Sequence, residues 1–404
     1  MFSEEKKYMK EPKIRFNGFS DPWEQRKVTE LGEIYIGLVT TMTAHYTNEG
    51  TLLIRNSDIK DGKFEFDSEP IYLDKEFAEQ NKSRMHKVGD VITVHTGDVG
   101  TSAVITENEA NSIGFATIVT RPNQELLDSY YLSTFLNTEK HKAWAVQMST
   151  GDGRTNYNLR DYTELIVPVP KLDEQKKIAR CISMLNHLIT LHQSRCDETK
   201  ELKKYMLQKM FPKEGETVPE IRFEGFTDDW EQRKLGDTVQ ITMGQSPDGS
   251  TYSEAPSDYI LVQGNADLKD GWVSPRVWTS QMTKKADAGD LIMSVRAPAG
   301  AMGKTAYNAV IGRGVAAIKG NEFIYQSLVK MDSNGYWKKL SSGSTFESLN
   351  SNNIKDAEIF VPCDEEQQKI GQYFSDLDHL ITLHQRKVEK LKEIKKFMLQ
   401  NMFI

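Results

Sequence analysis

Residues Pro298–Thr305 partly match the sequence motif of a phosphate-binding loop. They read PAGAMGKT, so that Gly303, Lys304 and Thr305 follow one another as in a P-loop. That motif also needs a glycine five residues before its last glycine, and Pro298 occupies this position. The run that follows, AYNAVIGRG, is typical of a strand, whereas a P-loop leads into a helix N-terminus that receives the phosphate. The sequence therefore predicts no nucleotide site here.

Two other fragments partly match catalytic motifs. Asp21-Pro22-Trp23 is close to the Asp-Pro-Pro-Tyr type motif of amino-methylating enzymes, but it lacks the second proline, and neither variable segment carries a glycine-rich fingerprint for S-adenosylmethionine. Glu198 and Lys200 would fit the end of a nuclease carboxylate–lysine motif, but alternating charges surround them in a predicted helix, which is typical of a solvated face. No catalytic residues are predicted, and a recognition or scaffolding protein is favoured over an enzyme.

Metal and disulfide chemistry are not predicted either. His192 and His384 occupy equivalent places in two copies of one helix, where we expect polar residues that set the register, since a metal site needs more nitrogen or sulfur ligands. The three cysteines, Cys181, Cys196 and Cys363, form no Cys-x-x-Cys pair. We therefore expect no metal site and no disulfide framework.

Composition limits the remaining classes. The chain has 404 residues, enough for two or three domains, with 38% hydrophobic and 27% charged residues, as in ordinary soluble proteins. No apolar run reaches the roughly 20 residues that span a membrane, and the start, MFSEEKKYMK, lacks the apolar core of a secretory signal. We expect a cytoplasmic protein without membrane contact. The net charge of −7 argues mildly against extensive nucleic-acid contact by this chain alone.

The chain is organised around a long helix that occurs twice. Asp173–Met210 and Glu365–Met402 are near-copies, 192 positions apart, that share HLITLHQ and end in KKYMLQKM and KKFMLQNM. Their apolar residues recur every three or four positions, the period of a coiled-coil seam. At about 1.5 Å per residue, each helix would run roughly 55 to 60 Å, too long for a helix inside a compact core. Duplication therefore defines the architecture.

A second repeat, which we call the tag, precedes each helix at a distance. Pro12–Lys27 reads PKIRFNGFSDPWEQRK and Pro219–Lys234 reads PEIRFEGFTDDWEQRK, and 12 of these 16 positions are identical. The tags are 207 positions apart, compared with 192 for the helices, so the segment between tag and helix is 15 residues shorter in the second half. Each half of the chain is thus a tag, a variable segment and a long helix.

The two variable segments share a skeleton but little sequence. Each has a hydrophobic strand that runs into a Lys-Asp-Gly turn, then a Gly-Asp turn, further short strands, and a Gly/Ser/Asn loop before a last strand. Pro168, Pro170 and Pro362 are expected to stop that last strand. The pattern favours an α+β module dominated by curved sheet. The expected domains are residues 1–167 and 214–361 for the two modules with their tags, and residues 168–213 and 362–404 for the two helices.

Loops in the variable segments carry residues suited to reading DNA. Glycine-rich loops bring backbone close to a ligand, and Arg, Asn, Gln, Thr and Tyr side chains contact base edges or phosphates. Any one of these residues can equally be a polar surface residue that only contacts water. The set is stronger than its members, because its loops occur at equivalent places in both halves. The candidate DNA-binding residues are Arg55, Asn56, His95, Thr96, Arg154, Asn156 and Tyr157 in the first half, and Gln263, Asn265, Arg296, Arg313, Ser344, Thr345 and Phe346 in the second.

Taken together, these features make the chain similar to the specificity subunits of Type I restriction-modification systems. The resemblance is carried by the WEQRK tag before each variable segment, the Gly-Asp strands with glycine loops, the PxxxEQxxI approach to the first helix, and the helix sequences LITLHQ and KKxMLQxMF. It covers essentially all 404 residues. The approach to the second helix, CDEEQQKI, is shorter than the family pattern.

The resemblance implies a fold and a function. Each variable segment would be a target-recognition domain that reads one half of a bipartite, asymmetric double-stranded DNA target. The two helices would pack as an antiparallel coiled coil of fixed length with pseudo-twofold symmetry. The chain would be non-catalytic and would bind no cofactor itself. The implied partners are two modification (methyltransferase) subunits with S-adenosylmethionine and two restriction subunits with ATP and Mg, and these chains would supply much of the positive charge around DNA.

An alternative is a two-headed coiled-coil scaffold that binds proteins. The sequence favours the DNA reader, because the helices are near-copies while the segments between them differ. A reader of two DNA half-sites needs a constant spacer while the recognised sequences change. A symmetric scaffold has little reason to keep its helices alike while its heads diverge.

Overall fold

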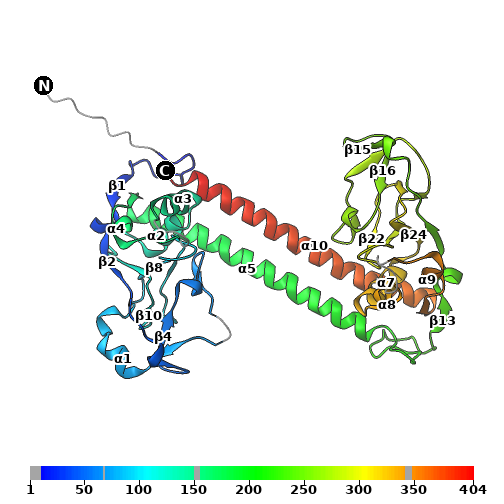
Figure 1. Ribbon diagram of the computed structural model, residues 1–404, viewed down its shortest axis with the longest axis horizontal. Helices are drawn as coiled ribbons and strands as arrows, with labels where there is room; N and C mark the ends of the chain where they lie inside the picture. Colours follow the sequence, from blue (N-terminus) through cyan, green and yellow to red (C-terminus); the bar gives the residue numbers. More distant parts are fainter. Residues whose placement is uncertain (1–10, 67–68, 150–154, 342–347) are drawn as a thin grey trace. The chain divides into compact units, whose positions relative to one another are not determined.

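The computed structural model describes residues 11–66, 69–149, 155–341 and 348–404 (Figure 1). By its contacts the chain divides into two compact units, residues 1–191 with 388–404 (unit 1) and residues 192–387 (unit 2). We call the globular part of unit 1 that precedes the first long helix head 1 (residues 11–171). The globular part of unit 2 that lies between the two long helices in the sequence is head 2 (residues 210–363).

Both predicted long helices are present, each 38 residues long: α5 spans Leu172–Lys209 and α10 spans Asp364–Asn401. Each begins in one unit and ends in the other. Contacts between them in unit 2 join His192 to His384, Cys196 to Ile381 and Lys203 to Asp378. Because positions rise along α5 as they fall along α10, the two helices are antiparallel there, as predicted. In unit 1, the start of α5 and the end of α10 share one hydrophobic core with head 1.

Head 1 is an α+β module, as predicted. One sheet has the order β2(Gly32–Ile36), β11(Ile118–Pro122), β8(Val91–Thr93), β9(Ser102–Val104), with neighbours antiparallel. A second sheet has the order β10(Ile113–Gly114), β4(Thr51–Ile54), β7(Tyr72–Leu73), β3(Tyr46–Thr47), with β10 and β4 parallel. Helix α2(Ser129–Leu136) packs on β8 and β9, and its residues share the core with the first sheet. The other α-helices are α1(Lys75–Gln80), α3(Glu139–Met148) and α4(Leu159–Thr163).

Head 2 has the same arrangement of two sheets, and each of its sheets has more strands. The first has the order β14(Gln240–Met243), β24(Val315–Lys319), β21(Leu291–Ser294), β22(Met302–Lys304), β18(Trp272–Val273), β17(Leu268–Lys269). The second has the order β15(Tyr252–Ser253), β19(Val277–Thr279), β16(Tyr259–Val262), β23(Ala309–Ile311), β20(Lys285–Ala286). The α-helices are α6(Leu235–Thr238), α7(Glu322–Ser333), α8(Tyr336–Ser341) and α9(Ser351–Lys355).

Each tag forms a strand that pairs with the last strand of its own head. In head 1, β1(Glu24–Lys27) pairs antiparallel with β12(Ile166–Val169), and in head 2, β13(Glu231–Lys234) pairs with β25(Glu358–Val361). The expectation that Pro168 stops the last strand is wrong, because Pro168 lies inside β12 opposite Gln25. A proline lacks the N–H of an inner strand, but this two-stranded ribbon leaves one side of each strand without a ladder.

The tag tryptophan and the end of a long helix meet in the core of each head. In head 1 the ring of Trp23 lies 6.4 Å from those of both Tyr131 and Phe403, and Phe403 follows the end of α10. In head 2, Trp230 lies 5.9 Å from Phe211, which follows the end of α5. These aromatic clusters explain why the tag and the KKxMLQxMF ending are repeated together: each head needs both to complete its core.

The tag arginine and the EQ pair at the start of each helix form a second repeated contact. Arg15 binds Glu174 at 2.8 Å, and Arg222 binds Glu366 at 2.7 Å, with both carboxylates buried. The glutamine that follows Glu174, Gln175, accepts a bond from the Asp128 N–H and donates to the backbone carbonyl of Pro170. The repeated EQ sequence therefore anchors each long helix to its own head. No helix in the described parts of the chain is long and apolar enough to cross a membrane.

Candidate nucleic-acid interface

Four predicted residues of head 1, namely Asn56, His95, Thr96 and Asn156, come together where several loops meet. The side chain of Asn56, in the turn after β4, accepts a hydrogen bond from the His95 N–H at 2.8 Å and donates to the carbonyl of Ala116 at 3.2 Å. Thr96, which follows β8, donates its hydroxyl proton to Asn156 at 2.9 Å. Asn56 and Thr96 thus join the loops after β4, β8 and β10 to the segment before α4. These predicted residues, which are far apart in the sequence, are therefore neighbours in space.

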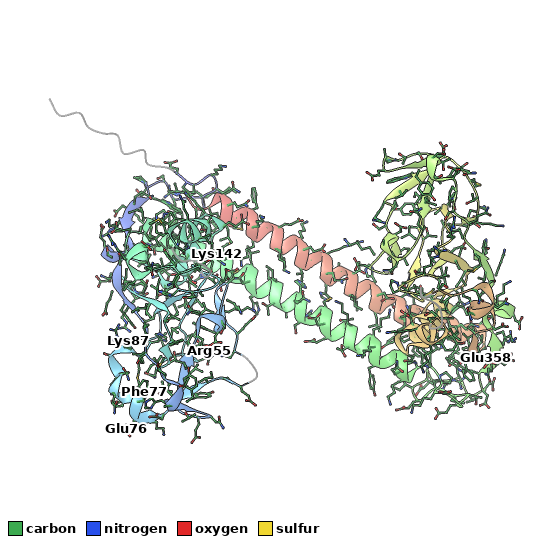
Figure 2. The ribbon with its side chains drawn as sticks, in the orientation of Figure 1. Arg55, Glu76, Phe77, Lys87, Lys142 and Glu358 are labelled. Atoms are coloured by element: carbon green, nitrogen blue, oxygen red, sulfur yellow. The ribbon has the colours of Figure 1, made fainter. Side chains whose placement is uncertain are left out.

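The side chains of Arg55 and His95 have partners within these loops, Asp58 for Arg55 and the Thr96 hydroxyl for His95. Arg55, labelled in Figure 2, binds the buried carboxylate of Asp58 through both Nε and Nη2, at 3.1 and 2.8 Å. This ion pair shapes the turn after β4, since Asp58 also accepts from the Arg55 N–H at 2.8 Å. His95 is half-buried, and burial lowers the pKa of its imidazole, so the ring is neutral at neutral pH.

The placement of Tyr157 corrects the prediction that it faces DNA. Its side chain is fully buried, with its ring 5.7 Å from that of Tyr162 and 5.9 Å from that of Trp144. Burial raises the pKa of the phenol well above its usual range, so the side chain stays neutral. Its backbone N–H donates to the His95 carbonyl at 2.8 Å. Tyr157 therefore supports the loops from inside the head.

Head 2 joins the corresponding loops through backbone bonds. The Val295 N–H, at the end of β21, donates to the carbonyl of Gly314 at 2.9 Å, and the Val295 carbonyl accepts from the Leu349 N–H at 2.9 Å. The Gln263 N–H donates to Asp267 at 2.7 Å, as Arg55 does to Asp58 in head 1. Among the predicted residues of this head, Arg296 and Arg313 are exposed and Gln263 and Asn265 are half-buried. Arg154, Ser344, Thr345 and Phe346 lie outside the described residues.

The fragment that partly matched a P-loop is structural. The Lys304 ammonium lies at the end of β22, pairs with Glu322 at 2.9 Å and sits 4.5 Å from the centre of the Tyr325 ring. The chain continues into strand β23 rather than into a helix. Lys304 therefore links sheet and helix α7 in head 2. Within the described residues, no group of three or more His, Cys, Asp and Glu side chains is placed to hold a metal ion.

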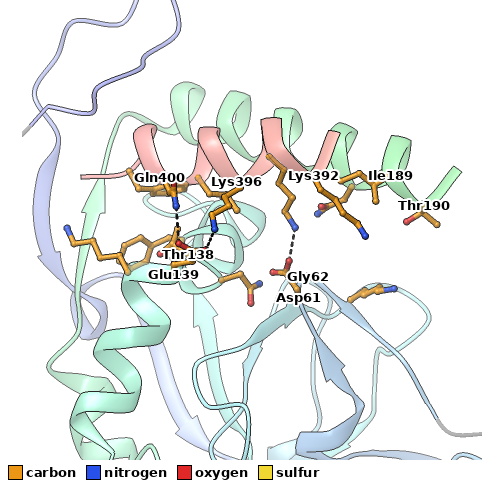
Figure 3. Close-up of a pocket in the computed structure, with 17 residues that line it drawn as sticks. Asp61, Gly62, Thr138, Glu139, Ile189, Thr190, Lys392, Lys396 and Gln400 are labelled. Atoms are coloured by element: carbon orange, nitrogen blue, oxygen red, sulfur yellow. Dashed lines mark hydrogen bonds and ion pairs between the residues drawn. The ribbon is translucent and has the colours of Figure 1, made fainter. Parts of the chain in front are cut away.

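A cleft of about 690 Å³ lies in unit 1 between head 1 and the end of α10 (Figure 3). On the head side it is lined by the turn at Asp61 and by Glu139 at the start of α3. Lys395 of α10 binds Asp61 at 2.6 Å, and Lys396 binds Glu139 at 3.2 Å. The cleft thus contains ion pairs that fasten head 1 to α10, and it does not include the loops described above.

Phe115, the aromatic residue of the loop after β10, is a neighbour of the predicted head 1 residues but was not predicted itself. Its side chain is 38% exposed, and its carbonyl accepts from the Asn56 amide at 3.4 Å, so it lies in the same loop cluster. A signal was present in the sequence: Phe115 follows the Ile-Gly pair that both halves share at Ile113 and Ile311. The predicted set consists mostly of polar side chains, with Tyr157 and Phe346 as its aromatic members, and it does not include Phe115.

Two α+β heads with corresponding loop clusters, carried on duplicated helices, define a two-headed recognition protein. The sequence model described as "Type I restriction modification DNA specificity domain" matches residues 20–201 and 227–393, and the chain belongs to this family. The family supplies the non-catalytic DNA-recognition component of Type I systems. The resemblance inferred from the tags and helices is therefore confirmed.

Similar proteins are known by sequence and by structure. A chain named as the type I restriction enzyme MjaX specificity subunit of Methanocaldococcus jannaschii is 26% identical over 405 residues, which cover 95% of this chain and 93% of that one. The S subunit of a Type I system from M. genitalium has a similar fold, with a TM-score of 0.68 at 16% identity, and covers 98% of this chain and 99% of that one. A further chain, from a study of the assembly of a type I R-M system, has a TM-score of 0.55 at 23% identity and covers 94% and 97% of the two chains.

Proposed function

We propose that head 1 and head 2 each read one half of a bipartite, asymmetric target in double-stranded DNA. The observation that carries this proposal is the pair of corresponding loop clusters, which differ in their side chains while tags and helices are near-copies. Because the loop side chains differ while the tags and helices that support them are alike, the two heads would recognise different half-sites. The continuous helices α5 and α10 would keep the spacing between the half-sites constant.

We propose that two modification subunits bind the exposed faces of the long helices and the tag strands. Large apolar side chains on these helices are exposed, although a solvated helix face is normally polar. They occur at equivalent positions in the two units, so each unit offers the same surface to one copy of the partner. The residues are Leu188, Leu191, Ile394 and Phe397 in unit 1, and Leu380, Leu383, Leu202 and Tyr205 in unit 2.

The chemistry would come from these partners. The modification subunits would carry S-adenosylmethionine and methylate adenine, and two restriction subunits would use ATP and Mg to translocate and cleave DNA. With a net charge of −7, this chain would depend on partner chains for much of the positive charge around the phosphates. We expect the complex to act in the cytoplasm, where it would meet DNA.

The direct test is to co-express the chain with the modification subunits of its own system and to map methylated adenines across the host genome. We expect a two-part asymmetric motif with a constant gap. An assembled complex that methylates no such motif would contradict the proposal and would favour the two-headed scaffold.

A further inference from the structure

We propose that Arg296 and Arg313 determine the specificity of head 2 and that each reads a guanine in the major groove. This inference rests on the proposed function and adds the chemistry of one half-site. It begins with the loops that join in head 2. Each of the two arginines lies directly beside one end of the bond between Val295 N–H and the Gly314 carbonyl, so both belong to one loop cluster.

Both arginines are free to bind a ligand. Arg296 and Arg313 are exposed, and neither guanidinium has a hydrogen-bond or ion-pair partner among the described residues. Most other arginines of the described chain are committed, as Arg55 is to Asp58 and Arg222 is to Glu366. An exposed guanidinium without a partner retains its five N–H donors, two of which match the O6 and N7 acceptors of guanine.

In the loop after β23, the residues on either side of Arg313 have no side chains that could cover it. Gly312 and Gly314 flank it, and both are buried. A Cβ on Gly314 would lie only 2.0 Å from the Gln263 carbonyl oxygen, so the packing of this loop against the turn after β16 requires glycine there. Arg313 is therefore the one side chain of this three-residue loop that projects into solvent.

Comparison with head 1 favours a base contact over a phosphate contact. Phosphates are the same at every site, so a phosphate-binding cation is equally useful to both heads, whereas a base-reading residue must differ between heads that read different sequences. Thr96 takes the place of Arg296 in head 1, and its hydroxyl is engaged with Asn156. The loop after β10 presents the apolar Phe115 in place of Arg313. The two arginines are thus particular to head 2.

The test uses the whole complex with its modification subunits and maps methylated adenines for the unchanged chain and for Arg313→Ala and Arg296→Ala. Alanine removes the guanidinium: loss of a base contact relaxes one position of the motif, whereas loss of a phosphate contact weakens methylation evenly and relaxes no position. We expect each variant to keep methylating the original motif while it accepts other bases at one guanine position. Discrimination at that position should fall by about tenfold to a hundredfold.

Two further variants show which half of the DNA motif each head reads. Phe115→Ala should relax the other half of the motif, and Lys75→Ala, which removes an exposed cation of helix α1 outside the loop clusters, tags and long helices, should leave the motif unchanged. The inference is overturned if the half-site of head 2 contains no guanine, or if both alanine variants keep the full motif. It is also overturned if the arginine variants and Phe115→Ala relax the same half. Absence of any motif with the unchanged chain would instead reject the proposed function, and this inference with it.

Discussion

The buried ion pair between Arg222 and Glu366 should be among the most sensitive points of head 2. Glu366 has a fully buried side chain, and Arg222 binds both of its carboxylate oxygens, at 2.7 and 2.8 Å. Arg222→Met keeps an unbranched side chain of similar length but removes both bonds. The carboxylate at the start of α10 is then left buried without a partner.

The expected loss in the free energy of unfolding is about 3–5 kcal/mol, because breaking a buried pair leaves an uncompensated charge. Two hydrogen bonds between charged groups, at about 1.5–3 kcal/mol each, give a similar sum. Replacing both partners, as in Arg222→Met with Glu366→Leu, removes the unpaired charge. The double variant should therefore recover most of the loss.

Urea unfolding followed by tryptophan fluorescence measures the loss, and amide hydrogen exchange shows which head opens. Arg15→Met is the matched variant, since Arg15 makes the same two-bond pair with Glu174 in head 1. Each substitution should speed exchange in its own head. A loss no larger than the roughly 1 kcal/mol typical of a surface pair, or no recovery in the double variant, would refute this reasoning.

Three further predictions concern the heads and the partner surface. Head 1 should weaken in mild acid before head 2, because burial lowers the pKa of His86 and His141 to about 4 and head 2 contains no histidine. The unfolded chain binds these protons more tightly, so stability present above about pH 6.5 falls by about 1.4 kcal/mol per pH unit for each histidine as the pH falls toward 4. Hydrogen exchange near pH 7 and near pH 5, corrected for intrinsic rates, would show it, and equal losses in both heads would contradict it. Phe403→Ala should destabilise unit 1 by about 3–5 kcal/mol in urea unfolding, since the ring completes an aromatic core, and an unchanged midpoint would count against that packing. Phe397→Glu should leave the melting temperature nearly unchanged but reduce co-purification of the modification subunits, and full co-purification would exclude this face as their binding surface.

The framework of this fold could be predicted because it is duplicated. Two near-copies of the helix and of the tag show which residues both heads must keep, and the spacing of three and four identifies the helix seam without reference to a structure. The partners of those residues could not be predicted. Arg15 and Glu174 are 159 positions apart, and nothing in local spacing joins an IRF sequence to an EQ sequence.

The loops show where sequence reasoning fails. Loops have no period, so burial cannot be read from spacing, and Tyr157 was predicted at the surface although its ring is buried. For Arg55 the sequence did contain an indication that the side chain is paired. Asp58 follows it three positions later, the spacing of a capped turn. Whether such an arginine is free or paired decides whether it can bind DNA, and that question needs coordinates.

The contacts that attach both heads in the same way are made largely by residues outside the variable segments. The tag supplies a tryptophan and an arginine, the helix that follows the head supplies the EQ pair, and the end of the other helix supplies a phenylalanine. Both heads use this same set, so the attachment does not depend on the loop residues that differ. A change at Arg313 or Phe115 alters an exposed side chain at little cost in stability, whereas a change at a tag residue disrupts a core. New recognition sequences can therefore arise in the loops while tags and helices remain near-copies.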